Sequence, residues 1–173
     1  MDWPLAVHQV LSQHRIGVVG YVPDGGHKRL IELCHADARM KCVVLSTEEE
    51  GVGLAAGAWL GGVRSVLLMQ SSGVGNIVNA LATVRECRFP LTVIVTMRGE
   101  NGEFNPWQVP MGQATDPVLR AMGAVVHHVD DAADVAGQVE ATLRIAHCSY
   151  CAAAVLIGQR VIGIKSFQEQ ANQ

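Results

Sequence analysis

The sequence has few aromatic and few charged residues, and it lacks any long uninterrupted apolar run. Aromatic residues make up 5% and charged residues 17% of the 173 residues, whereas hydrophobic residues make up 49%. This balance excludes a disordered chain, and the length is typical of one domain with its own core. A net charge of −3 gives no electrostatic reason to expect a nucleic-acid partner. A membrane span, which needs about 18 apolar residues in a row, is also not expected.

The N-terminal segment and the cysteines both indicate a cytoplasmic protein. No basic stretch followed by an apolar stretch comes after Met1, so we expect no signal peptide. Five cysteines are an odd number spread through apolar segments, which is typical of reduced thiols. Cys148 and Cys151 have Cys-x-x-Cys spacing, but no second pair accompanies them. We therefore expect a structural role for them and no resident metal in this chain.

Short β-branched runs alternate with helical patterns along the whole chain. Strands are expected over residues 16–21, 42–45, 65–69, 91–96, 124–129 and 152–157. Helices are expected between them, including 3–11, 30–38, 48–60, a helix ending at Val84, one from Pro117 to Gly123 and one from Asp131 through Leu143. The alternation predicts one three-layer α/β domain over residues 1–165, with a six-stranded, mostly parallel sheet and helices on both faces. Residues 98–113 predict a long loop, and residues 166–173 a polar C-terminal tail.

Three consecutive carboxylates, Glu48, Glu49 and Glu50, stand at the predicted start of a helix. Acidic side chains there interact favourably with the helix dipole, so all three could be structural. Ser46 and Glu49 also have the spacing of a capping box, in which Glu49 would hydrogen-bond back to the cap. Glu48 differs because it heads the apolar stripe that continues at Val52. A carboxyl group in such a place is costly unless it is hydrogen-bonded, so a functional and a structural role are equally open.

A second informative segment follows the third predicted strand and contains Gly73, Val74 and Gly75. A glycine turn between a strand and a helix can hold a phosphate group at the start of the helix. The segment is neither a dinucleotide fingerprint nor a P-loop, because no Gly-Lys-Ser/Thr follows it. A tight turn that needs positive φ at glycine is the alternative interpretation.

Taken together, these stretches resemble the pyrimidine-binding domain of thiamine-diphosphate-dependent 2-oxoacid decarboxylases. The resemblance runs over about residues 18–157. Its motifs are Val22-Pro23-Asp24, the helix that begins with the three glutamates and contains Ala55-Ala56-Gly57, Gln70-Ser71-Ser72-Gly73-Val74-Gly75-Asn76, Pro90, Arg98-Gly99-Glu100 and Gln108-Val109-Pro110-Met111-Gly112. Two of these runs, Glu-Glu-Glu-Gly-Val-Gly and Gln-Val-Pro-Met-Gly, look most similar to the small α chain of two-chain sulfopyruvate decarboxylases. Phosphonopyruvate decarboxylases are the second most similar group.

The resemblance implies roles for particular residues. In the family, a glutamate nine residues before the glycine of an Ala-x-Gly helix motif hydrogen-bonds the ring nitrogen of the cofactor's aminopyrimidine. Counting back from Gly57 gives Glu48, which the apolar stripe also singles out. Gly73, Val74 and Gly75 would lie near the pyrimidine, with Asn79 in support. The substrate-side candidates are Asp24, His27, Lys28, Arg98 and Gln108. The cations among them could meet an anionic substrate group, but each is as easily a solvated surface charge.

The chain resembles only one half of such an enzyme. The family's diphosphate-binding domain carries a Gly-Asp-Gly motif and a downstream Asn that hold Mg²⁺ and the diphosphate, and Gly-Asp-Gly does not occur here. The resemblance therefore implies a hetero-oligomer in which a β subunit holds Mg²⁺ and both chains bind thiamine diphosphate. The implied reaction is that of a carbon–carbon lyase, the decarboxylation of sulfopyruvate to sulfoacetaldehyde and CO₂. A subunit of a phosphonopyruvate or other 2-oxoacid decarboxylase, and a non-catalytic α/β ligand- or partner-binding module, are the alternatives.

Overall fold

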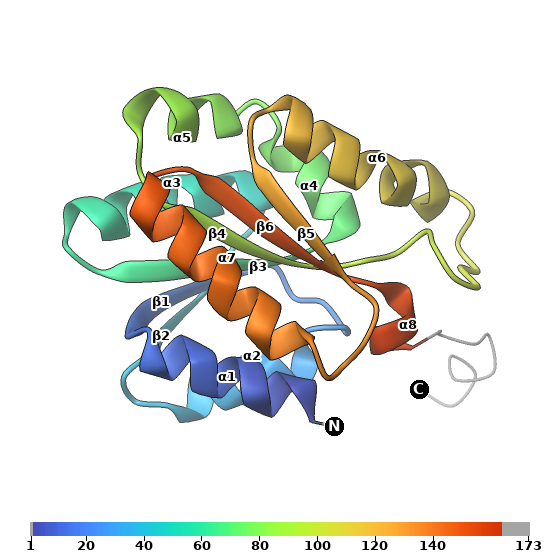
Figure 1. Cartoon of the computed structure of the whole chain (residues 1–173), viewed down its shortest axis with the longest axis horizontal. Coiled ribbons are helices and arrows are strands. Elements are labelled where there is room, and N and C mark those ends of the chain that lie inside the picture. The colour runs from blue at the N-terminus through green and yellow to red at the C-terminus, as the bar shows by residue number, and fades with distance from the viewer. Residues whose placement is uncertain (1, 164–173) are drawn as a thin grey trace.

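The computed structural model describes residues 2–163, which fold as alternating strands and helices (Figure 1). The strands are β1 (Ile16–Tyr21), β2 (Lys41–Val44), β3 (Arg64–Gln70), β4 (Leu91–Thr96), β5 (Val125–Val129) and β6 (Ala152–Ile157). The helices are α1 (Trp3–Gln13), α2 (Lys28–Ala36), α3 (Glu48–Leu60), α4 (Ser71–Ile77), α5 (Leu81–Cys87), α6 (Gln108–Ala121), α7 (Val135–Ser149) and α8 (Gln159–Ile162). No helix within residues 2–163 has both the length and the apolar character that a bilayer crossing requires.

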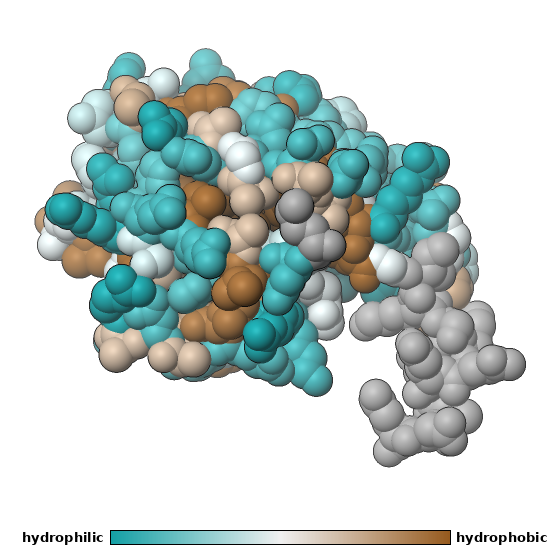
Figure 2. All heavy atoms as spheres, turned by 60° about the horizontal axis from the view of Figure 1, so that its bottom comes forward, coloured by the Kyte–Doolittle hydropathy of each residue, from teal (hydrophilic) through white to brown (hydrophobic). Residues whose placement is uncertain are grey.

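The strands form one parallel sheet in the order β2-β1-β3-β4-β6-β5. Strands β4 and β6 are buried along their whole length, and β3 is buried except at its two ends. Near-continuous apolar runs of this kind are expected where helices cover both faces of a parallel sheet. Helices α1, α2 and α7 lie on one face, and α3, α4, α5 and α6 lie on the other (Figure 1). The face at the bottom of Figure 1 carries mostly hydrophilic side chains, with small apolar areas between them (Figure 2).

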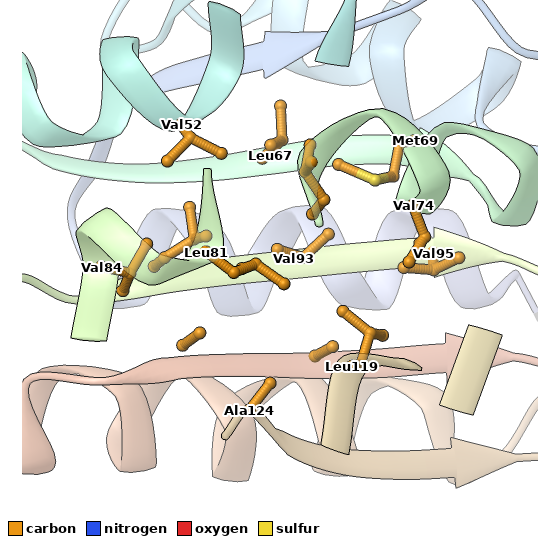
Figure 3. Close-up of a cluster of buried hydrophobic side chains, with 14 of the residues drawn as sticks. Val52, Leu67, Met69, Val74, Leu81, Val84, Val93, Val95, Leu119 and Ala124 are labelled. Atoms are coloured by element: carbon orange, nitrogen blue, oxygen red, sulfur yellow. The ribbon is translucent and has the colours of Figure 1, made fainter. Parts of the chain in front are cut away.

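Each face of the sheet has its own hydrophobic core. On one face, Val52 of α3, Val74 of α4 and Leu119 of α6 pack in a cluster with Leu67 of β3 and Val93 of β4 (Figure 3). The opposite cluster joins side chains of α1, α2 and α7 to the other face, among them Leu11, Leu30, Leu68, Val139 and Leu143. Fully burying each of these aliphatic side chains contributes about 1.5–3 kcal/mol relative to leaving it exposed. The two cores thus hold the helices against both faces of the sheet. The loops follow the carboxyl ends of the strands, outside these cores.

The predicted architecture is confirmed, but the segment from Arg98 to Gln113 is not a loop throughout. Helix α6 begins at Gln108, so the loop covers only residues 98–107. Pro110 is the third residue of α6, where a backbone N–H would have no partner within the helix, so a proline is tolerated there. Pro117 lies inside α6 instead of at its first position, so the predicted start of this helix at Pro117 is wrong.

The predicted glycine turn after β3 is also wrong. Helix α4 begins at Ser71, directly after the strand, and includes Gly73 and Gly75. Neither glycine has a positive φ, so the turn interpretation does not apply. A separate helix, α5, then completes the connection to β4. The predicted C-terminal tail, residues 166–173, lies outside the described residues.

Candidate active site

The chain reverses its direction across the sheet between β1 and β3. From β1 it passes to the edge strand β2 and then returns past β1 to β3, so the connections after β1 and β3 leave toward opposite faces. Ligands of open α/β sheets bind in the crevice that forms at such a point, outside the carboxyl ends of the strands. The predicted site residues Asp24, Glu48 and Gly73 come from this edge of the sheet, in the loop after β1, at the start of α3 and in α4.

Glu48 is the first residue of α3, and its side chain is only 7% exposed. Asn76 of α4 donates a hydrogen bond from Nδ2 to Glu48 Oε2 over 2.7 Å. Gly73 lies against the same carboxylate so closely that a Cβ at this position would collide with it. A buried carboxylate is stable only when its oxygens are hydrogen-bonded, and Asn76 supplies such a bond. This position can form a hydrogen bond with a polar group that approaches the carboxyl edge of the sheet.

The other two glutamates face away from this site. Glu49 is exposed at the second position of α3. Glu50 Oε2 accepts a hydrogen bond of 2.9 Å from the backbone N–H of Ser46. The predicted capping box between Ser46 and Glu49 is therefore wrong, because the cap is Thr47 and the third helical residue is Glu50. Glu50 satisfies a backbone donor, which is a structural role.

Asn76 is the site residue that the sequence interpretation overlooked. It belongs to the glycine segment, in which the resemblance implies Asn79 as the supporting amide. Asn79 lies beyond the end of α4, whereas Asn76 lies within α4 and donates a hydrogen bond to Glu48. In a helix that begins at Ser71, Gly73 and Asn76 are three residues apart and share one face. That spacing would have identified Asn76, had the segment been interpreted as a helix. Val74 is fully buried in the core, so its side chain does not line the crevice.

Replacing Gly73 by alanine is expected to lower the free energy of unfolding by about 1–3 kcal/mol, because the new methyl group must displace the Glu48 carboxylate. Gly75→Ala is the matched control in the same helix. A Cβ there meets only the Met111 sulfur at 3.6 Å, and the substitution should be neutral or stabilise by about 0.4–1 kcal/mol. Urea denaturation of both variants measures the difference. Equal stability of the two would contradict the close approach of α4 to Glu48.

Asp24 is the centre of a polar cluster at the same carboxyl edge of the sheet as Glu48. Its carboxylate accepts hydrogen bonds from Thr96 Oγ1 at 2.6 Å, Gln70 Nε2 at 2.9 Å and the Gly26 N–H at 3.1 Å. Burial raises the pKa of Asp24, but the hydrogen bonds from Thr96, Gln70 and Gly26 outweigh this effect, so its pKa lies below the ordinary value. Asp24 is thus an ionised acceptor fixed between the ends of β1, β3 and β4.

His27 underlies this cluster and is fully buried. Its Nε2 lies 3.2 Å from the Met69 carbonyl oxygen and 3.1 Å from the Ile94 carbonyl oxygen, so this nitrogen carries the hydrogen that is donated. Burial lowers the pKa of His27 below its ordinary value, which keeps the ring neutral. A neutral ring that bridges β3 and β4 is a structural element, so His27 is not the cation that the sequence interpretation considered.

Arg98 is also not available as a free cation. It is 7% exposed and forms a bidentate ion pair with Glu103, with Nε–Oε2 and Nη2–Oε1 distances of 2.6 and 2.5 Å. The hydrogen bonds from Arg98 lower the pKa of Glu103 to about 2, so the pair is ionised at neutral pH. The Arg98 backbone N–H donates to Ser71 Oγ over 3.0 Å, which ties the loop after β4 to the start of α4. The structure therefore indicates that Arg98 positions this loop.

Lys28 and Gln108, the remaining substrate-side candidates, lie at the first positions of α2 and α6. Lys28 is exposed. The Oε1 atom of Gln108 is buried and accepts no hydrogen bond from the described residues. The backbone of Gln108 packs against Gly99, whose φ of 77° and close approach both require glycine. The turn after β4 thereby holds Gln108 beside the loop that carries Arg98.

Comparisons with known proteins place this geometry in context. A family model for the thiamine pyrophosphate enzyme N-terminal TPP binding domain matches residues 4–116. The sulfopyruvate decarboxylase subunit alpha of Methanothermobacter thermautotrophicus is 41% identical over 123 residues, which cover 70% of this chain and 74% of that subunit. The same subunit of Methanococcus maripaludis is 34% identical over 118 residues, covering 68% and 71%. Phosphonopyruvate decarboxylase of Streptomyces viridochromogenes is 35% identical over 106 residues, covering 60% of this chain and 27% of that protein.

A solved structure supports the fold independently. It is the 2-oxoglutarate:ferredoxin oxidoreductase from Magnetococcus marinus with 2-oxoglutarate, coenzyme A and succinyl-CoA bound. The two structures superpose with a TM-score of 0.74 at 14% sequence identity, over 94% of this chain. This chain spans only 29% of the oxidoreductase chain, and at such low identity the likeness concerns the fold alone. It agrees with the three-layer α/β domain that the sequence predicts.

Proposed function

Because this chain belongs to the family of thiamine pyrophosphate enzymes, we propose that it is the pyrimidine-binding α subunit of a two-chain sulfopyruvate decarboxylase. The reaction converts sulfopyruvate to sulfoacetaldehyde and CO₂, with a proton replacing the departing carboxylate. The observation that carries the proposal is the buried Glu48 carboxyl group, held between α3 and α4 at the carboxyl edge of the sheet. The α subunits that are 34–41% identical to this chain support the choice of substrate.

The residues at this edge fit the aminopyrimidine half of thiamine diphosphate. Asn76 donates to Oε2 of Glu48 and fixes the carboxyl group, to which we assign the ring nitrogen of the pyrimidine. The close contact at Gly73 holds the carboxyl group in place, and Gly75 is exposed on the same helix. Bound thiamine diphosphate supplies the electron sink that a decarboxylation requires. Glu48 contributes a proton and a hydrogen bond that favour the reactive tautomer of the pyrimidine.

A partner chain is needed to complete the site. The sequence has no Gly-Asp-Gly motif, so we assign Mg²⁺ and the diphosphate to a β subunit that carries this motif. Helix α3 offers a surface for such a partner, because a Cβ on Gly53 or Gly57 would meet nothing and Leu60 is 86% exposed. Small and apolar side chains on one exposed surface permit close approach of another chain. The buried Gln108 Oε1 accepts no hydrogen bond from the described residues and is a further acceptor for a donor group of the partner.

The reconstituted complex is expected to prefer sulfopyruvate over pyruvate by about 10- to 150-fold in kcat/KM. A charge-assisted hydrogen bond to the sulfonate contributes about 1.5–3 kcal/mol, which corresponds to that ratio. Because Arg98 is paired with Glu103, Lys28 is the cation that we assign to the sulfonate. Lys28→Gln should remove most of this preference and leave kcat/KM for pyruvate unchanged.

Arg29→Gln is the matched control, since Arg29 is an adjacent exposed cation that lies 4.0 Å from Glu32. Its kcat/KM for sulfopyruvate should equal that of the wild type. Equal kcat/KM for pyruvate and sulfopyruvate would contradict the substrate assignment. Faster turnover of phosphonopyruvate would favour the reaction named for the Streptomyces relative. No decarboxylation of any 2-oxoacid with the partner present would favour a binding module.

A further inference from the structure

Three potential metal ligands converge at the other half of the carboxyl edge, away from β1 and β2. Glu100 lies in the loop after β4, His128 lies in β5, and Asp130 follows β5 directly. One donor atom from each lies within 4.8 Å of the other two. The three side chains line one pocket of about 320 Å³ together with Asn101 and Arg160. The proposed function does not use any of them.

The structure holds Glu100 in place through Gln159, which is 2% exposed. The Gln159 backbone N–H donates to Glu100 Oε2 over 2.9 Å, and Gln159 Oε1 accepts the Glu100 N–H over 3.0 Å. Gln159 Nε2 also donates to Glu103 over 2.9 Å, which joins this arrangement to the Arg98 ion pair. Hydrogen bonds to a ligating carboxylate orient it for a metal. Glu100 Oε1 is then the oxygen that faces His128.

Asp130 is placed by close packing against the end of β6. A Cβ on Gly158 would collide with Asp130 Oδ1, so the carboxylate lies directly over this glycine. Gly158 also donates its backbone N–H to the Val129 carbonyl oxygen over 2.8 Å, which fixes the residue before Asp130. Two of the three ligands are thus positioned by contacts with residues 158 and 159.

The spacing of the donor atoms suits a small divalent ion. Nε2 of His128 lies 3.2 Å from Oε1 of Glu100, and the two form an ion pair that a bound metal ion would replace. Two ligand atoms that each lie about 2.1 Å from one ion, at a tetrahedral or octahedral angle, are about 3.0–3.4 Å apart. One imidazole and two carboxylates suit zinc and its neighbours among the transition metals better than Mg²⁺ or Ca²⁺, which prefer oxygen ligands alone. Arg160 lines the same pocket and His128 is paired with Glu100, so a dication binds there by replacing the proton that His128 shares with Glu100.

We propose that Glu100, His128 and Asp130 form a binding site for a divalent transition-metal ion, with Zn²⁺ as the ion of choice. Such an ion ties the loop over residues 98–107 to the ends of β5 and β6. That loop contacts α4 through Arg98 and Ser71, so the metal secures an element that borders the Glu48 site. The site lies in this chain and is separate from the Mg²⁺ assigned to the partner.

The untagged full-length chain, treated with a chelator and dialysed, is titrated with Co²⁺ and the bound ion is then displaced with Zn²⁺. We expect one saturable Co²⁺ per chain, with visible absorption bands and without the intense near-ultraviolet band of thiolate ligands. Asp130→Asn and His128→Gln should each weaken binding at least about tenfold. Asp134→Asn, at an exposed carboxylate four residues from Asp130 and outside the cluster, should bind as the wild type does.

Zn²⁺ should also raise the Tm of the wild-type chain and not that of His128→Gln. The metal-free Tm values of both should agree closely, because His128 lies on an edge strand and its ion pair with Glu100 is at the surface, where such pairs contribute little to stability. A thiolate band would assign the ion to cysteines and overturn the proposal. Absence of saturable binding, or binding that neither variant weakens, would overturn it as well.

Discussion

Glu48→Gln is expected to lower kcat of the reconstituted decarboxylase by about 10²–10⁴-fold, the usual range for loss of a general acid or base. Glutamine has the size of glutamate and an oxygen that can still accept the hydrogen bond from Asn76. It cannot supply the carboxyl proton that the pyrimidine nitrogen requires. The Tm of the variant and its assembly with the partner should therefore remain close to those of the wild type.

The neighbouring glutamates provide matched controls within the same helical turn. Glu49 is exposed, and a glutamine at position 50 can still accept the N–H of Ser46. Glu49→Gln and Glu50→Gln should each change stability by no more than about 0.3–1 kcal/mol, the contribution of a charge at a helix N-terminus. Their kcat values should equal that of the wild type. A low kcat for either of them, with normal turnover by Glu48→Gln, would reassign the catalytic residue.

The isolated chain is expected to turn over sulfopyruvate at least about a thousandfold more slowly than its complex with the β subunit. The physical reason is that we assign only the pyrimidine to Glu48, whereas the charged diphosphate needs Mg²⁺ and ligands that we assign to the other chain. Without that anchor, thiamine diphosphate should bind weakly, and the complex should show a correspondingly lower Kd. Isothermal titration of cofactor with Mg²⁺, first to the chain and then to the complex, measures this difference.

Disruption of the exposed face of α3 that we assign to the partner should also lower the turnover of sulfopyruvate. Gly57→Leu places a large side chain on an exposed face of α3, where nothing within the described residues opposes it. The chain should remain folded but lose assembly and turnover. Robust decarboxylation by the purified chain alone, with thiamine diphosphate and Mg²⁺, would contradict the division of the site between two subunits.

Much of the fold could be predicted because the local pattern and the tertiary environment agree. The apolar runs of β1, β4 and β6 are where the sequence predicts them, since a strand covered on both faces needs little else. The sequence also predicts α3 correctly in spite of its glycines. One of them, Gly51, packs directly against Leu67, which makes a glycine compatible with the helix at this position. The same reasoning identified Glu48 as the buried acid, from its place at the head of the apolar stripe.

The errors come from segments in which proline or glycine serves packing instead of ending a helix. Gly112 lets α6 approach the Arg98 carbonyl oxygen, and Pro110 lies in the first helical turn, so both are compatible with a helix. The sequence leaves Arg98 open between a substrate contact and a solvated surface charge, because its ion-pair partner Glu103 lies in an irregular loop, where no periodicity reveals a contact. The role of Asn76 depended on recognising α4, which begins without any gap after β3.

Hydrogen–deuterium exchange at C2 of thiamine diphosphate in the reconstituted complex tests the central role of Glu48 most directly. This exchange depends on the tautomer of the pyrimidine and not on the substrate, so it is independent of the substrate assignment. The expected result is that Glu48→Gln slows exchange by orders of magnitude, whereas Glu49→Gln and Glu50→Gln exchange at the wild-type rate. Exchange by Glu48→Gln as fast as in the wild type would contradict the assignment of Glu48 as the residue that activates the cofactor.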